Sequence, residues 1–168
     1  SLSEAQLLRD LLHALQGVDS ACFKYRREEG RFEVSPSCLL SRPAWCLAHR
    51  ILELANAHLH LCGATNGALV ETQSGRSLVH QALCEALRDQ LRDYYKVLAL
   101  LMSKTDAPDQ GRSGGVAGVG TPELSLRRLW TWLQAPLEHM RLLATLCEAC
   151  APLRGGALIS AVHSLARA

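Results

Sequence analysis

The sequence predicts an all-α fold, an irregular bundle or array of about six helices with a short hairpin-like insertion near residues 22–35. Two observations support this fold class. Apolar residues recur at helical spacing along most of the chain, whereas the alternation typical of strands occurs only near the insertion. With 168 residues, of which 48% are hydrophobic and 20% charged, the chain is long enough to bury one core. We expect residues 1–168 to form a single module, and the missing initial methionine suggests that it is a piece of a larger protein.

The first helix is expected from Ser3, as N-cap, to Gly17, the residue type favoured just past a helix end. Gln6 stands where it would complete a capping box with Ser3. Burial of each leucine on the helix contributes roughly 1.5–3 kcal/mol, so packing decides that this helix forms. Its apolar stripe consists of Leu7, Leu8, Leu11, Leu12 and Leu15.

Residues 22–35 change period and predict a hairpin. Phe23 and Tyr25, and then Phe32 and Val34, alternate with polar residues around a turn that contains Gly30. A second helix is expected to begin near Trp45 and to end near Gly63. Its His58 and His60 lie two positions apart, on different sides of a helix, and we expect them to be exposed or half-buried.

The longest periodic segment predicts a third helix from about Ser77 to Ser103, with a mixed-charge outer face. Its apolar stripe includes Leu78, Leu87, Leu91, Tyr94, Leu98 and Leu101. Residues 105–120 contain five glycines and no core-forming run, which predicts a flexible loop.

Three further helices are expected in the last third of the chain. Thr121 as cap and Pro122 in the first turn open one that should stop before Pro136. Another covers residues 137–150, and the last follows Gly155.

Composition excludes several classes of function. The net charge is +2 with scattered basic residues, so neither nucleic acid nor a membrane surface is expected as a partner. The longest uncharged run, residues 54–70, is interrupted by polar residues and glycines and should not span a membrane. Seven cysteines, mostly inside apolar helical patterns, indicate a reducing intracellular compartment.

Cys147 and Cys150 form the only spacing that suggests metal or redox chemistry. A zinc site needs four ligands, and no second pair at a suitable spacing accompanies them, so core packing is favoured over a zinc or redox role. No serine or cysteine stands in a recognisable catalytic context. We therefore expect no enzymatic activity, no cofactor and no metal.

Two sets of residues are candidates for binding a partner. The first helix and the turn after it contribute Arg9, Asp10, Gln16 and Asp19. The simpler interpretation of these residues is caps and intramolecular pairs, and Asp19 in particular suits a bond to backbone groups of its turn. The helix near residue 130 contributes Arg127, Arg128 and Trp132, because Trp130 and Trp132 cannot share one helix face and tryptophan is enriched at interfaces.

Four strings, in order along the chain, resemble the gamma-tubulin complex components, also known as spindle pole body components. "LLRDLLHALQGVDS" (7–20) is similar to the family's opening motif, with His13 in place of an aromatic residue and Ser20 in place of glycine. "ALRDQLRDYYKVLALL" (86–101), "LSLRRLWTWLQAP" (124–136) and "RGGALISAVHSLARA" (154–168) are similar to its later helical signatures.

The resemblance implies an N-terminal helical scaffold module of the ring that templates microtubule nucleation. It implies lateral contacts with other gamma-tubulin complex components, whereas gamma-tubulin would be bound only through a C-terminal half absent from this sequence. The implied location is the cytoplasm and cytoskeleton, at the microtubule-organising centre or spindle pole. The alternative is a generic helical adaptor that binds an amphipathic peptide of a partner in a groove between helices.

Overall fold

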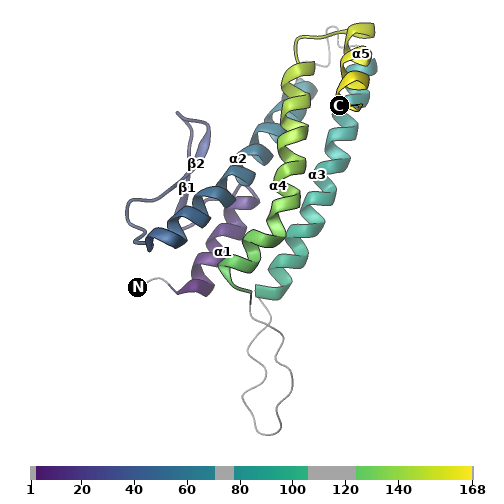
Figure 1. Ribbon diagram of the computed structural model, residues 1–168. Coiled ribbons are helices and arrows are strands. Elements are labelled where there is room, and N and C mark those ends of the chain that lie inside the picture. The colour runs from purple at the N-terminus through teal and green to yellow at the C-terminus, as the bar shows by residue number, and fades with distance from the viewer. Residues whose placement is uncertain (1–2, 71–77, 106–123, 168) are drawn as a thin grey trace, which may run out of the picture.

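The computed structural model describes residues 3–70, 78–105 and 124–167, which contain five helices and a two-stranded antiparallel sheet (Figure 1). The elements are α1 (Glu4–Leu15), β1 (Phe23–Arg26), β2 (Arg31–Val34), α2 (Arg42–Val70), α3 (Leu78–Thr105), α4 (Leu126–Cys150) and α5 (Gly155–Leu165). The predicted class, mainly α with a small hairpin, is confirmed. The long helices α2, α3 and α4 form the bundle, α1 packs against α2 and α3, and α5 packs against α3 and α4.

The first helix begins and ends as its sequence predicts. The Ser3 hydroxyl accepts a hydrogen bond from the Gln6 backbone N–H at 3.2 Å. At the other end Gly17 adopts φ +82°, and the Val18 N–H donates to the carbonyl of His13 at 3.0 Å. This is the hydrogen bond of a Schellman motif, which satisfies a carbonyl that the helix leaves open.

Gly17 is also required by the packing of α1 against α2. A Cβ atom at this position would lie 3.1 Å from Cδ2 of Leu59, and the left-handed backbone disfavours other residues. The sequence motif that ends α1 therefore also permits its close approach to α2.

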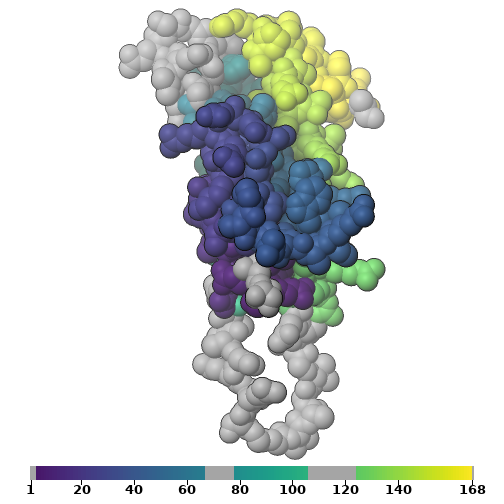
Figure 2. Space-filling view, turned by 90° about the vertical axis from the view of Figure 1, so that its left-hand side faces the viewer, coloured from purple at the N-terminus to yellow at the C-terminus, as the bar shows by residue number. Residues whose placement is uncertain are grey.

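The predicted hairpin is confirmed, with Phe23 opposite Val34 and Tyr25 opposite Phe32. Phe23 and Phe32 are buried in the main core, while the other side of the sheet is largely exposed. Gly30 turns the chain with φ +65°. The hairpin and the beginning of α2 stand on one face of the bundle (Figure 2).

The prediction of six helices was wrong, because α4 continues through Pro136. Proline removes one backbone donor and disfavours a helix interior. Here Leu133 and Leu137 on either side are 0% and 4% exposed, respectively, so continued burial of the leucine stripe outweighs the local penalty.

The second helix also extends past its predicted end at Gly63 and reaches Val70. A glycine in a helix interior costs only about 1 kcal/mol. The buried residues Leu61 and Thr65 flank it, and the Thr65 hydroxyl donates to the Leu61 carbonyl at 2.9 Å. Tertiary packing thus carries the helix through the glycine.

Other expectations shift by a few residues or lie outside the described residues. Ser125 is the N-cap of α4, accepting from the Arg128 N–H at 3.3 Å. The predicted cap Thr121, with Pro122, and nearly all of the glycine-rich loop 105–120 lie outside the described residues. Leu78, expected on the apolar stripe of α3, is 82% exposed.

One pair of cysteines is bonded, which the expectation of reduced thiols did not anticipate. Cys22 precedes β1, and Cys38 lies between β2 and α2, with their Cα atoms 5.2 Å apart. In the described part of the chain, no helix is both long and apolar enough to cross a membrane.

Candidate functional site

Asp10, predicted as a partner contact, lies inside the molecule and holds the hairpin to α1. It is 3% exposed. Its Oδ2 accepts a hydrogen bond from the Cys22 N–H at 3.0 Å, and its Oδ1 accepts from the Gln6 side-chain amide at 2.9 Å. The Gln6 side chain therefore supports Asp10 rather than completing a capping box with Ser3.

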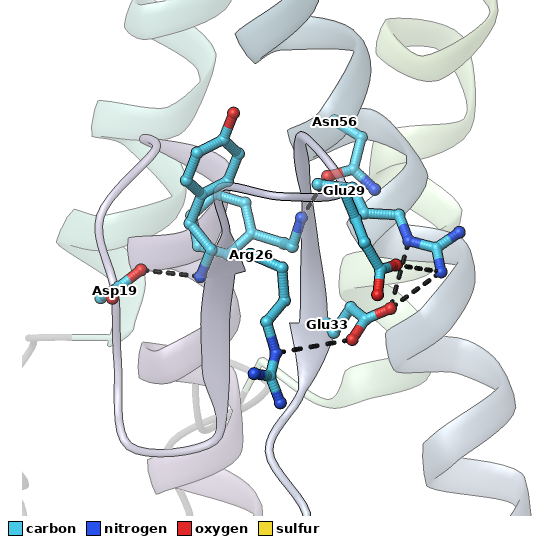
Figure 3. A network of polar contacts seen from close by, with 8 residues as sticks. Asp19, Arg26, Glu29, Glu33 and Asn56 are labelled. Atoms are coloured by element: carbon cyan, nitrogen blue, oxygen red, sulfur yellow. Dashed lines mark hydrogen bonds and ion pairs between the residues drawn. The ribbon is translucent and has the colours of Figure 1, made fainter.

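Two further side chains cap the outer edges of the hairpin (Figure 3). Asp19 Oδ1 accepts from the Tyr25 N–H on β1 at 2.9 Å, and Asn56 Oδ1 of α2 accepts from the Phe32 N–H on β2 at 2.7 Å. Edge strands with open donors invite pairing with another chain. Because Asp19 and Asn56 occupy these donors, they disfavour the addition of a third strand at both positions.

The exposed face of the hairpin carries an ion-pair network (Figure 3). Arg31 lies 2.6 Å from Glu29 and 2.8 Å from Glu33, and Arg26 lies 3.7 Å from Glu33. The hydrogen bond from Arg31 lowers the pKa of the Glu33 carboxyl, and Glu33 in turn raises the pKa of Arg31. Water screens such exposed pairs, so they shape the charge of this surface more than they stabilise the fold.

Gln16 joins the end of α1 to α3. Its side-chain amide donates to the Leu12 carbonyl at 3.1 Å and approaches the Met102 sulfur at 2.7 Å. Arg9, in contrast, is exposed and makes no hydrogen bond or ion pair with other described residues. Of the four candidates near α1, Arg9 therefore offers the freest side chain to a partner.

The second group of candidates lies where α3 ends and α4 begins. Arg127 and Arg128 are exposed on the first turn of α4, and Trp132 is 45% exposed. The Lys104 ammonium lies 4.2 Å from the centre of the Trp132 ring, a cation–π contact between α3 and α4. We call Lys104, Arg127, Arg128 and Trp132 the basic tryptophan surface.

The two tryptophans of α4 have different surroundings, as their spacing predicts. Trp130 is half-buried, with the Arg50 guanidinium 5.8 Å from its ring centre, and joins α4 to α2. At the helix start, Glu4 of α1 accepts from the Leu126 N–H at 2.8 Å. This bond brings the first turns of α1 and α4 together.

The structure also contains a buried polar cluster that the sequence reasoning missed. His58, expected to be at least half exposed, is 2% exposed, and its Nε2 lies 2.7 Å from the Tyr95 hydroxyl and 3.3 Å from the Cys62 sulfur. Burial lowers the pKa of His58 to about 4, and its Nδ1 has no hydrogen-bond partner among the described residues. The i, i+4 spacing of His58 and Cys62 was the available signal.

The neighbouring tyrosine ties this cluster to α1. The Tyr94 hydroxyl donates to the Leu15 carbonyl at 2.8 Å, and burial raises the pKa of Tyr94 above its ordinary value. Burial also raises the pKa of Tyr95 to about 12. Both phenols therefore stay protonated near neutrality and act as hydrogen-bonding groups between helices.

The C-x-x-C pair lies near the end of α4. Cys150 is 1% exposed and Cys147 is half-buried, and burial raises the pKa of both thiols. Within the ranges that the structure describes, no three His, Cys, Asp or Glu side chains are placed to hold a metal ion. The arrangement is that of partly buried thiols at the edge of the helical core.

The fold and these surfaces define a mainly helical module with a pinned hairpin and an exposed group of tryptophan and basic side chains. Residues 8–168 match the family described as gamma tubulin complex component N-terminal. The chain belongs to this family.

Named relatives agree with this assignment. The chain is 35% identical to gamma-tubulin complex component 3 of Homo sapiens over 164 residues, which are 97% of this chain and 17% of the relative. It is 34% identical to gamma-tubulin complex component 3 of Arabidopsis thaliana over 167 residues, 96% of this chain and 19% of the relative. It is 23% identical to spindle pole body component 98 of Dictyostelium discoideum over 212 residues, 99% of this chain and 25% of the relative.

The particular wording of two strings, "LRDYYKVLALL" and "GGALISAVHSLA", resembles the third component of the complex, in agreement with two of these relatives. The chain spans between 17% and 25% of the length of the three relatives.

Proposed function

We propose that this chain is the N-terminal structural module of a gamma-tubulin complex component and makes lateral contacts with neighbouring components in the ring that nucleates microtubules. The observation that carries the proposal is the family match over residues 8–168. The module has no enzymatic role in this proposal. It acts in the cytoplasm, at the microtubule-organising centre or spindle pole.

The packing of the module supports a scaffold role on physical grounds. A side-to-side assembly needs a subunit of fixed shape, because the shape sets the angle to the next subunit. Here Glu4 joins α1 to α4, Gln16 joins α1 to α3, and Asp10 joins α1 to the hairpin. These links support a rigid unit rather than a set of independently moving helices.

The contact surfaces that we propose are exposed Arg9 and the basic tryptophan surface. Tryptophan and arginine are enriched among the residues that dominate interface energies. Asp10, Gln16 and Asp19 would act from inside, by holding the elements that present those surfaces. Gamma-tubulin would be bound by a region of the protein outside this sequence.

Sedimentation velocity tests the proposal directly. The purified chain is mixed with the corresponding N-terminal region of another gamma-tubulin complex component, and in parallel with gamma-tubulin. A complex with the first and none with the second is expected. A complex with gamma-tubulin alone would refute the proposed division of labour.

Trp132→Ala and Trp45→Ala form a matched pair of variants. The two side chains are 45% and 46% exposed, but Trp45 lies at the start of α2 and stacks on His49. We expect Trp132→Ala to weaken the complex at least tenfold and Trp45→Ala to leave it unchanged, since hot-spot truncations remove about 2 kcal/mol or more. Equal effects of the two would remove the basic tryptophan surface from the interface. Saturable binding of an isolated amphipathic peptide, without binding to the other component, would favour the helical adaptor instead.

A further inference from the structure

The disulfide joins the two ends of the hairpin region. Cys22 lies before β1 and is 2% exposed, whereas Cys38 lies in the connection to α2 and is partly exposed. Their Cα separation of 5.2 Å is within the ordinary range for a disulfide. The bond closes a loop with a sequence separation of 16, so it constrains both the hairpin and the connection behind it.

The hairpin itself has other attachments to the bundle. Phe23 and Phe32 are buried in the core, and Asp10 and Asn56 accept hydrogen bonds from its backbone. Loss of the disulfide would therefore leave the strands seated.

The connection from residue 35 to residue 41 has fewer attachments. Leu39 is 90% exposed, and Ser35 and Ser37 bond chiefly to each other through their hydroxyls at 2.8 Å. The Cys38 N–H donates to the Ser35 carbonyl within the same segment at 2.9 Å. The bond to Cys22 is thus the main link between the middle of this connection and the rest of the molecule.

We propose that Cys22 and Cys38 are a site of reversible thiol oxidation that fastens or releases the connection between the hairpin and α2. In a reducing cytoplasm the pair would be two thiols, and it would close when the surroundings become oxidising. The pairing is independent of the proposed function. Only its use in the cytoplasm rests on that function, so the two can fail separately.

The oxidant that closes the pair is a small-molecule disulfide of the glutathione class. The Cys38 thiolate, which is the more accessible, attacks one sulfur of the small disulfide, forms a mixed disulfide and releases one small thiolate. The Cys22 thiolate then attacks the Cys38 sulfur and releases the second. Two electrons pass from the cysteine pair to the small disulfide, and the two thiol protons end on the two released thiols.

The remaining five cysteines are free and differ in their surroundings. Burial raises the pKa of the Cys62, Cys147 and Cys150 thiols, which lowers their thiolate fraction. Cys46 is exposed and unpaired in the structure, which makes it the internal control for simple exposure.

The purified chain is equilibrated in glutathione buffers from fully reduced to fully oxidised, quenched by alkylation and digested for mass spectrometry. We expect Cys22 and Cys38 to lose reactivity together and to appear in one cross-linked peptide, while Cys46 gains single glutathione adducts. Independent alkylation of Cys22 and Cys38 at every buffer ratio would overturn the proposal.

A second measurement tests the release of the connection. Reduction is expected to lower Tm by roughly 5–10 °C and to speed chymotryptic cleavage after Leu39 several-fold, with the helical CD signal unchanged. Cys38→Ser should cleave like the reduced protein in both buffers, and Cys46→Ser like the original chain. A Tm and a cleavage rate that do not respond to reduction would overturn the proposal without bearing on assembly.

Discussion

The buried carboxylate of Asp10 provides the sharpest test of the packing described above. Its replacement by alanine removes the acceptor of the Cys22 N–H, which is buried. A buried donor left unpaired costs about 1–3 kcal/mol, and 1 kcal/mol shifts Tm by about 2–4 °C in a domain of this size. We therefore expect Asp10→Ala to lower Tm by roughly 2–12 °C.

Asp10→Asn distinguishes the hydrogen bond from the charge. Asparagine keeps an oxygen that can accept from Cys22, and its amide can face the Gln6 side chain, which has both a donor and an acceptor to offer. This variant should lose less than half of the stability that Asp10→Ala loses. Arg9→Ala, one residue away and exposed, is the control and should stay within about 0.5 kcal/mol of the original chain.

Urea denaturation followed by CD at 222 nm measures all three variants on one scale. If Asp10→Ala unfolds at the same urea concentration as the original chain, the carboxylate does not hold the hairpin. If Asp10→Asn is as unstable as Asp10→Ala, the negative charge and not the accepted hydrogen bond is responsible.

Three further predictions concern other parts of the molecule. Because the pKa of His58 is lowered to about 4, the unfolded chain binds more protons below pH 6.5, so stability should be full above pH 6.5 and fall by at most about 3 kcal/mol as the pH drops to 4; in urea titrations across this range, His58→Gln should show a flatter dependence, and an equal slope would contradict the assignment. Asn56→Ala should cost about 1–3 kcal/mol and speed hydrogen exchange of the Phe32 amide, whereas unchanged exchange would show that the edge is capped by something else. Pro136→Ala should raise Tm by a few degrees because it restores a backbone donor within α4, and a lowered Tm in a thermal scan would mean that the helix depends on the proline.

Local patterns predicted those parts of the fold that depend on neighbours along the chain. The start and end of α1, the alternation of the hairpin and the apolar stripes of the long helices follow from capping, turn chemistry and periodicity, which act within a few residues. The family assignment also came from short strings in order, which need no knowledge of contacts. These are properties that the amino-acid sequence determines by itself.

Tertiary packing decided the remainder, because it depends on residues far apart in the sequence. Pro136 and Gly63 are local helix breakers, yet buried residues beside them carry α4 and α2 onward. Only the approach of other elements shows that Asp10 is an internal acceptor and that Cys22 meets Cys38. Periodicity states which face of a helix is apolar, whereas the partner of a polar side chain is set by three-dimensional proximity, and the assignment of Arg9, Asp10 and Asp19 to surface or interior depended on that difference.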